Sequence, residues 1–355
     1  MKRAKSFYDV QRNYPGDWSF PALPFFVWCR KAAQVLPVDD FELVAAHKMS
    51  LSKWKMKYPD PRLGLINKTV MYVKAKYVVQ EINTDIFKNP KTLNENYIRL
   101  QKHLKDKSNN IKIPKLLKHW EHILKWPDGK AKRTPYTHSP LKPHKEHIAM
   151  RSFEYIPSKS FLKPKNEDMA FKAAFAFGKF QEAFLDMNLD QIKETIPNFH
   201  DIDSRFSQLE NAAKKDVIGR MEKIHKEVNE VLKEKSLWGF LSQEMKNCEK
   251  RIVHYDTKIS NILFDKNHNV KAIIDLDTAM PGFTFLDYGD MIRSMCSKSK
   301  EDSKSINKVK IDKALFEAVT EGYLSATEEW LTLNEKSYLF KGAMYITLEN
   351  AVRFL

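Results

Sequence analysis

Residues 251–278 constrain the fold more than any other part of the chain, because short β-prone runs alternate there with polar residues at fixed spacings. Residues 251–253 and 261–264 are β-prone runs on either side of a loop. Residues 265–269 are typical of a hairpin turn, and residues 270–274 predict the returning strand. Because a hairpin brings its two ends together, polar side chains at those ends are expected to meet in one place.

The polar residues at the ends of this hairpin are those that phosphoryl transfer requires. They are His254, Asp256, Asn261, Asp275 and Asp277. We predict that Asp256 is the catalytic base, or at least the acceptor for the attacking hydroxyl, and that His254 orients the loop through its ring N–H. Asn261 and Asp275 are predicted to hold Mg²⁺, which takes few protein carboxylates beside phosphate oxygens and water. Asp277 is either a second metal contact or an acceptor for loop N–H groups. Each residue alone is more often a turn or cap residue, but the ordered set favours the functional interpretation.

This ordered set resembles the aminoglycoside phosphotransferase and choline kinase-like superfamily, whose fold is similar to that of protein kinases. Residues 275–282 and 286–293 are similar to the N-acetylhexosamine 1-kinases within it. Further likenesses lie at residues 77–83, 177–181 and 195–201. The resemblance runs from about Gly64 to the last residue. It implies that ATP and Mg²⁺ are used to phosphorylate the anomeric hydroxyl of N-acetylglucosamine or N-acetylgalactosamine.

The resemblance also implies an α+β, two-lobed, protein-kinase-like fold with a small antiparallel-sheet N-lobe and a larger helical C-lobe. We expect a nucleotide-binding N-lobe at residues 61–156 and a C-lobe with the catalytic and metal-binding loops at residues 157–355. Residues 1–60 stay unassigned.

The pattern of apolar and polar residues predicts where the helices and strands of each lobe lie. In the N-lobe we expect two strands within residues 63–80, a helix at 90–104, a loop-rich basic segment at 109–148 and a strand at 151–156. Apolar residues at helical spacing predict C-lobe helices at residues 167–188, 216–235, 308–330 and 336–355.

The nucleotide contacts rest on resemblance. They are expected at Gly64, Asn67, Thr69, Gln80, Glu154 and Ile156. Residues 63–69 contain one glycine where kinase-like folds cover the phosphates with a glycine-rich turn. Gln80 stands where such folds place a strand lysine, so Glu95, the expected helix partner, lacks its cation. Lys68 or Lys76 would then supply the charge.

The sugar contacts are also expected by resemblance, ahead of the catalytic loop. They are Asn198, His200, Asp201 and Arg205. Two alternatives stay open here, because Asp201 is equally suited to cap a helix and Arg205 to form a surface ion pair. Asp287 and Asp290 are expected on the loop after the metal ligands, with Asp287 holding the catalytic loop through its backbone.

The composition of the chain limits the classes of binding partner that we expect. The net charge of +15, from 60 basic against 45 acidic residues, is scattered without a basic recognition helix, so a solvated lysine-rich surface is favoured over nucleic-acid binding. No apolar run reaches the roughly 20 residues of a membrane span. The three cysteines show neither metal-ligand nor disulfide spacing. We therefore expect a cytoplasmic enzyme with a small-molecule sugar substrate and no nucleic-acid or membrane partner, and leave its oligomeric state open.

Two other functions stay open. The first keeps the chemistry but has another small alcohol or an aminoglycoside as acceptor, although a polycation calls for an acidic pocket. The second is a kinase-like binding protein with weak or no catalysis, which the single glycine of residues 63–69 suggests. The complete set of Asp256, Asn261 and Asp275 argues against the second.

Overall fold

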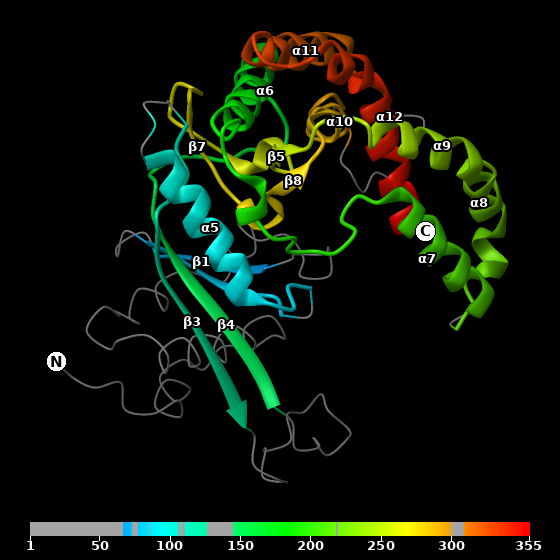
Figure 1. Ribbon diagram of the computed structural model, residues 1–355, viewed down its shortest axis with the longest axis horizontal. Helices are drawn as coiled ribbons and strands as arrows, with labels where there is room; N and C mark the ends of the chain where they lie inside the picture. Colours follow the sequence, from blue (N-terminus) through cyan, green and yellow to red (C-terminus); the bar gives the residue numbers. More distant parts are fainter. Residues whose placement is uncertain are drawn as a thin grey trace, which may run out of the picture.

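The computed structural model describes residues 67–72, 77–84, 86–105, 107, 111–125, 145–217, 219–297, 299 and 309–355. The unassigned residues 1–60, and with them Gly64 and Lys76, lie outside these ranges. Figure 1 shows a sheet with one helix beside it and a larger group of helices on the other side of the short strands. This is the α+β, two-lobed kinase-like arrangement that the sequence predicts.

The sheet has four strands in the order β1-β2-β4-β3, and every neighbouring pair is antiparallel. Its strands are β1 (Asn67–Tyr72), β2 (Tyr77–Ile82), β3 (Leu116–Lys125) and β4 (Lys145–Glu154). The expected loop-rich segment at residues 109–148 is therefore wrong in part, since it contains β3 and the start of β4. Main-chain pairing between β3 and β4 over most of their length outweighs the weak strand preference of their lysines.

Helix α5 (Pro90–Lys105) confirms the helix predicted at 90–104 and joins the sheet to the rest of the molecule. Leu93, near its start, packs in a cluster with Ile82 of β2 and Ala149 of β4. Further along the same face, Leu100 and Leu104 belong to the main core. The 3.6-residue periodicity of this face fixes which side of the helix is buried.

The described residues of the helical part form four predicted helices and three that the sequence pattern did not show. The predicted ones are α6 (Glu167–Glu182), α8 (Met221–Lys233), α11 (Lys313–Thr327) and α12 (Leu333–Phe354). The others are α7 (Ile202–Lys215), α9 (Lys235–Met245) and α10 (Thr284–Met295). Most of α10 is buried, polar residues included, so it has no solvent face whose periodicity could reveal it.

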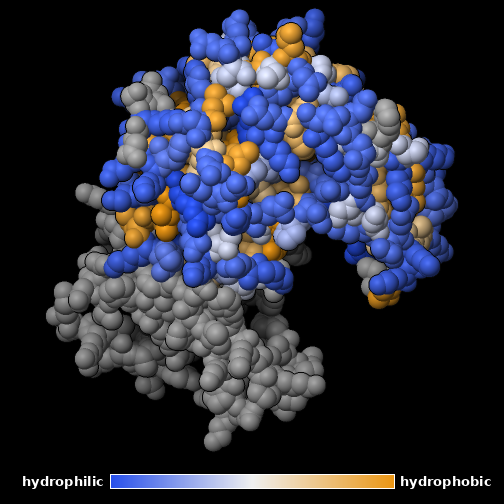
Figure 2. All heavy atoms as spheres, in the orientation of Figure 1, coloured by the Kyte–Doolittle hydropathy of each residue, from blue (hydrophilic) through white to orange (hydrophobic). Residues whose placement is uncertain are grey.

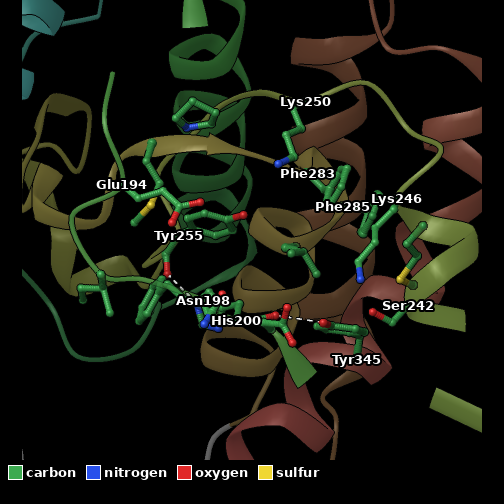
Figure 3. Close-up of a pocket in the computed structure, with 17 residues that line it drawn as sticks. Glu194, Asn198, His200, Ser242, Lys246, Lys250, Tyr255, Phe283, Phe285 and Tyr345 are labelled. Carbon is green, nitrogen blue, oxygen red and sulfur yellow. Dashed lines mark hydrogen bonds between the residues drawn. The ribbon is translucent and has the colours of Figure 1, made fainter. Parts of the chain in front are cut away.

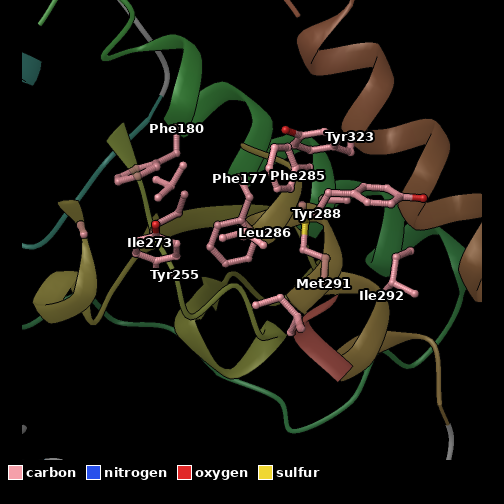
Figure 4. Packing of buried hydrophobic residues seen from close by; sticks show 14 of the residues in the cluster. Phe177, Phe180, Tyr255, Ile273, Phe285, Leu286, Tyr288, Met291, Ile292 and Tyr323 are labelled. Atoms are coloured by element: carbon pink, nitrogen blue, oxygen red, sulfur yellow. The ribbon is translucent and has the colours of Figure 1, made fainter. Parts of the chain in front are cut away.

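Short strands hold the predicted catalytic segment against these helices. The predicted hairpin is confirmed as β6 (Ile262–Phe264) paired with β7 (Val270–Ile273). A second pair, β5 (Arg251–Val253) with β8 (Met280–Gly282), was not anticipated. Figure 4 shows Phe177 and Phe180 of α6, Phe285 and Leu286 of α10 and Tyr323 of α11 packed around these strands, all within one buried cluster.

The described surface is mostly hydrophilic, as expected for a chain rich in charged residues. The described atoms on the face seen in Figure 2 are mostly hydrophilic, with small hydrophobic patches between them. Among the described residues, no helix combines the length and the apolar character that a bilayer crossing requires.

Two glycines allow α10 and α12 to pack with their backbones in contact. A Cβ added at Gly289 of α10 would collide with the backbone carbonyl of Gly342 on α12, and one added at Gly342 would collide with the carbonyl of Phe285. A backbone atom in a helix cannot turn aside as a flexible side chain can, so this contact requires both glycines.

Gly289→Ala should therefore lower the free energy of unfolding by about 1–3 kcal/mol, the usual cost of overpacking. Gly239→Ala on α9 is the matched control, because the nearest neighbour of its added Cβ is Asp203 Oδ1 at 3.4 Å. That control should be neutral or stabilising by up to about 1 kcal/mol, since alanine favours helix. Urea unfolding of both variants tests this, and equal stability for the two would contradict the packing argument.

Candidate active site

The predicted catalytic loop, called the catalytic loop below, runs from β5 to β6 and ends in a short 3₁₀ turn, Ile259–Asn261. The side-chain amide of Asn261 donates hydrogen bonds to both the main-chain oxygen and Oδ2 of Asp256, each at 2.8 Å. Lys258 Nζ lies 3.2 Å from the same Oδ2. The Asp256 carboxylate is thus fixed from two sides while its side chain stays 21% exposed, which suits a group that must receive a substrate hydroxyl.

His254 lies inside the core below this loop, with its ring against the edges of Phe177 and Phe180. Its Nε2 is 3.0 Å from the carbonyl of Ile274, and its Nδ1 accepts from the N–H of Asp256 at 3.3 Å. A carbonyl only accepts and an N–H only donates, so this pattern assigns the neutral tautomer with the proton on Nε2. Both ring nitrogens are used to join the catalytic loop to the end of β7, which makes His254 an orienting residue.

Asp287 holds the loop from underneath. It lies in the first turn of α10, not on a loop as expected, and its carboxylate accepts from the backbone N–H groups of His254 at 2.9 Å and Tyr255 at 2.7 Å. Gln181 of α6 donates a further hydrogen bond at 2.8 Å. Burial raises the pKa of Asp287, and these donors act against that shift. The predicted contact between Asp287 and the backbone of the catalytic loop is confirmed.

Asp275 follows β7 directly, in the left-handed conformation with φ 64°. Burial first, and then the neighbouring carboxylates of Asp277 and Asp256, raise its pKa to about 7, while Lys258 and Arg151 act in the opposite direction. Several acidic groups therefore surround one small volume, as the hairpin geometry requires. A negative region of this kind favours the binding of a cation.

The donor set fits a magnesium ion shared with a nucleotide. Among the described residues, no group of three or more His, Cys, Asp or Glu side chains could hold a metal by itself. Mg²⁺ has no need of such a group, because it is held by one or two carboxylates plus phosphate oxygens. The amide nitrogen of Asn261 is used by Asp256, which leaves the amide oxygen for a metal, and Asp275 would supply the carboxylate.

Asp277 has a partner that the sequence did not suggest. Its Oδ1 accepts from the Arg151 guanidinium, and both side chains are almost fully buried. The hydroxyl of Thr195 donates to the main-chain oxygen of Asp277 at 2.7 Å. A second metal contact from Asp277 stays a prediction.

The expected nucleotide contacts lie mainly along the sheet. Asn67 and Thr69 are on β1, and Gln80 on β2 pairs with Thr69. Glu154 ends β4, and its N–H donates to the carbonyl oxygen of Lys115 at 2.9 Å. Ile156 follows two residues later, and its carbonyl accepts from the Ser158 hydroxyl at 2.7 Å. All of these assignments stay predictions.

Glu95, the expected helix partner of position 80, forms its ion pairs elsewhere. Glu95 forms its ion pairs with Lys91, at 3.9 Å, and Arg99, at 3.5 Å, on its own helix. Gln80 instead accepts a hydrogen bond from Arg151.

Three of the four expected sugar contacts line one cavity of about 280 Å³ beside the catalytic loop: Asn198, His200 and Asp201. Figure 3 shows Glu194 and Asn198 on one side of this cavity and Lys246 and Lys250 on the other. Tyr255, one residue before Asp256, is also part of the lining.

Two of the expected sugar contacts have the structural duties considered as alternatives. Asp201 caps α7 by accepting from Ser204 N–H at 2.8 Å. Arg205 does not line the cavity and pairs with Glu349 at 2.8 Å, although this pair is buried rather than at the surface. Burial acts to raise the pKa of Glu349, but His200 and Arg205 together lower it to about 2.

Sequence reasoning missed two charged residues of the site, Lys258 and Arg151. Lys258 could have been found, because its position two residues after Asp256 keeps it on the same short loop. Arg151 carried no such signal, since it lies more than a hundred residues from Asp277 in sequence and meets it only in the folded protein.

Comparison with known proteins now identifies the family. A model of the phosphotransferase enzyme family matches residues 64–328, well over half of the chain. The chain belongs to this family. The prediction of a phosphotransferase enzyme is thereby confirmed. The predicted catalytic loop, the predicted metal ligands and all of the cavity lining except Tyr345 lie within the matched residues.

Solved structures similar to this phosphotransferase include small-molecule kinases. An aminoglycoside-3'-phosphotransferase of type VIII is 12% identical over 85% of this chain and 97% of its own, with a TM-score of 0.44. An aminoglycoside phosphotransferase from Streptomyces rimosus, in complex with ADP and streptomycin, is 10% identical over 80% and 89%, with a TM-score of 0.48. A microcompartment-associated aminopropanol kinase is 11% identical over 78% and 76%, with a TM-score of 0.41.

The raised pKa of Asp275 predicts how stability changes with pH. The folded protein keeps this carboxyl protonated up to about pH 7, whereas the unfolded chain ionises it near 3.8. Its contribution to stability is therefore complete below the unfolded pKa and is lost as pH rises through the folded pKa. Asp275→Asn removes the titration, so the variant should gain stability relative to the natural protein between about pH 4 and pH 7 and no further above that.

Urea unfolding of both proteins across this range measures the difference. A difference in stability that does not change with pH would show that Asp275 is not a strongly perturbed group.

Proposed function

We propose that this phosphotransferase transfers the γ-phosphoryl group of ATP to the anomeric hydroxyl of an N-acetylhexosamine, with Mg²⁺ as cofactor. The observation that carries the proposal is the convergence of Asp256, Asn261 and Asp275 from the two ends of one hairpin. The choice of sugar is supported by the resemblance of residues 275–282 and 286–293 to the N-acetylhexosamine 1-kinases.

In this proposal Asp256 orients the acceptor. Its carboxylate, held by the Asn261 amide and by Lys258, would accept a hydrogen bond from the sugar hydroxyl and direct that oxygen towards the phosphoryl group. His254 and Asp287 keep the loop rigid, so the carboxylate does not have to be ordered at each turnover. Asn261 and Asp275 would hold the Mg²⁺, which when bound neutralises charge on the nucleotide phosphates.

The cavity beside the loop supports a neutral sugar over a polycation. Its lining contains two acids, Glu194 and Asp201, and two lysines, Lys246 and Lys250. The Asp201 carboxylate is further occupied as a helix cap. A polycationic aminoglycoside would need a clear excess of negative charge, which this lining lacks.

The rest of the lining has the character of a small-ligand site. Aromatic side chains, Phe199, Phe283 and Phe285 among them, are combined with the amide of Asn198 and the hydroxyl of Tyr345. Apolar walls with a few placed polar groups are typical of sites for small molecules. The free, buried thiols of Cys248 and Cys296 fit a reducing compartment, and we infer a cytoplasmic location.

A panel assay tests the proposed reaction. The protein is incubated with ATP, Mg²⁺ and one acceptor at a time, drawn from N-acetylhexosamines, other sugars, amino alcohols and aminoglycosides. ADP release and the phosphorus NMR shift of the product are followed. We expect release with the N-acetylhexosamines and an anomeric phosphate signal. Release with amino alcohols or aminoglycosides alone would reassign the acceptor, and nucleotide binding without any release would indicate a binding protein.

The role of Asp256 is tested by Asp256→Asn. Turnover should fall by roughly 10²-fold or more, because the positioned acceptor is lost, while nucleotide affinity stays close to that of the natural protein. Asp168→Asn is the matched control, since Asp168 lies exposed on α6, where it forms an ion pair with Lys172 four residues on. Turnover of Asp256→Asn equal to that of the control would remove Asp256 from the mechanism.

The sugar site has its own test. Asn198→Ala should raise KM for the sugar by up to about 10-fold, the scale of one lost hydrogen bond, without changing KM for ATP. Kinetics with each substrate varied in turn measure both constants. An effect on ATP alone would place Asn198 at the nucleotide.

A further inference from the structure

This phosphotransferase has no lysine at the strand position that binds the nucleotide phosphates in kinase-like folds. Kinase chemistry places a lysine on a strand of the sheet to hold the nucleotide phosphates, and Gln80 occupies that strand position here. Three carboxylates, those of Asp256, Asp275 and Asp277, lie around the metal position, with Lys258 and Arg151 beside them. A polyphosphate cannot be held beside several carboxylates without positive charge from the protein as well as the metal.

Arg151 lies directly across from the lysine position. In the antiparallel pairing of β2 with β4, Arg151 is the residue opposite Gln80, and opposed residues place their side chains on the same face of a sheet. The Nε of Arg151 donates to Gln80 Oε1 at 2.7 Å. The guanidinium thus reaches the lysine position from the next strand.

The guanidinium is held in one orientation at the junction of the two lobes. Its Nη2 donates to Asp277, two residues after the predicted metal ligand Asp275. Its central carbon lies 5.0 Å from the centre of the Phe153 ring. These contacts leave the remaining nitrogen in a fixed position, which is the preorganisation that a phosphate-binding group needs.

That remaining nitrogen has no partner among the residues that the structure describes. Nη1 of Arg151 is buried and makes no hydrogen bond within the described part of the chain. Leaving a charged donor unpaired in a buried site is costly, so the position calls for an acceptor supplied from outside. A phosphate oxygen is the acceptor that guanidinium groups bind best.

We propose that Arg151 is the phosphate-binding cation of the nucleotide site and replaces the strand lysine. Gln80 and Asp277 hold the guanidinium, and Nη1 donates to a phosphate oxygen of the nucleotide. Because the side chain is only 1% exposed, nucleotide binding must open a path to Nη1 by moving neighbouring groups. The presence of glutamine at position 80 then has a reason, since a lysine there would place two cations side by side.

This inference rests on the proposed use of a nucleotide, but it does not depend on which acceptor is phosphorylated. Calorimetry of the full chain with MgADP, and competition by adenosine, separate the phosphate contribution from that of the nucleoside. Arg151→Gln should weaken MgADP binding by about 10-fold or more and leave adenosine binding unchanged. Gln80→Lys combined with Arg151→Gln should return MgADP affinity to within about threefold of the natural protein.

The matched control is Arg251→Gln. Arg251 also has a mostly buried guanidinium. Its Nε lies 2.9 Å from Glu335 Oε1, and its central carbon lies 5.2 Å from the centre of the Trp330 ring. It is on β5, which pairs with β8 and is not part of the four-stranded sheet. Its loss should cost stability without a selective effect on MgADP. Should Arg151→Gln be too unstable to study, Arg151→Lys keeps the charge without the fork and should bind MgADP more weakly than the natural protein but with the same adenosine affinity.

Three results would overturn the proposal: unchanged MgADP affinity in Arg151→Gln, an equal loss for MgADP and adenosine, or a double variant no better than Arg151→Gln. Failure of the natural protein to bind MgADP would instead overturn the proposed function. Nucleotide binding with phosphorylation of an acceptor other than an N-acetylhexosamine would overturn only the choice of acceptor.

Discussion

The site depends on the hydrogen bonds that the buried carboxylate of Asp287 accepts. It accepts the backbone N–H groups of His254 and Tyr255, and it is tied in turn to α6 through Gln181. These hydrogen bonds join the catalytic loop to two core helices. An ionised carboxylate would be costly to bury alone, so the surrounding donors are what make this position stable. The loop keeps its shape because the helical core keeps Asp287 in place.

The same core concentrates negative charge in the site, and this has a cost. Asp275 is buried next to Asp256 and Asp277, and its pKa is raised accordingly. Lys258 and Arg151 offset part of this repulsion by pairing with Asp256 and Asp277. A cluster of carboxylates of this kind favours the binding of a cation, which is the role proposed for it here.

Two neighbouring residues of the catalytic loop, Tyr255 and Asp256, differ in their surroundings. Tyr255 has a left-handed backbone conformation with φ 62°, and it is buried against the wall of the cavity while Asp256, the next residue, remains partly exposed. Tyr255 therefore contributes to the proposed sugar site, and Asp256, its neighbour, to the proposed chemistry. Gly282 leaves room for the Tyr255 ring, because a Cβ there would collide with its hydroxyl.

The sequence by itself determined the hairpin, the order of Asp256, Asn261 and Asp275, and helices such as α5 and α6, because local spacing and periodicity carry that information. It did not reveal α10, whose sides are almost all buried and therefore show no amphipathic pattern. Nor could it pair Arg151 with Asp277, since strand register and the meeting of the two lobes decide that contact. Only the tertiary structure brings together residues that are distant in the chain, and the balance of charge in this site is set by such residues.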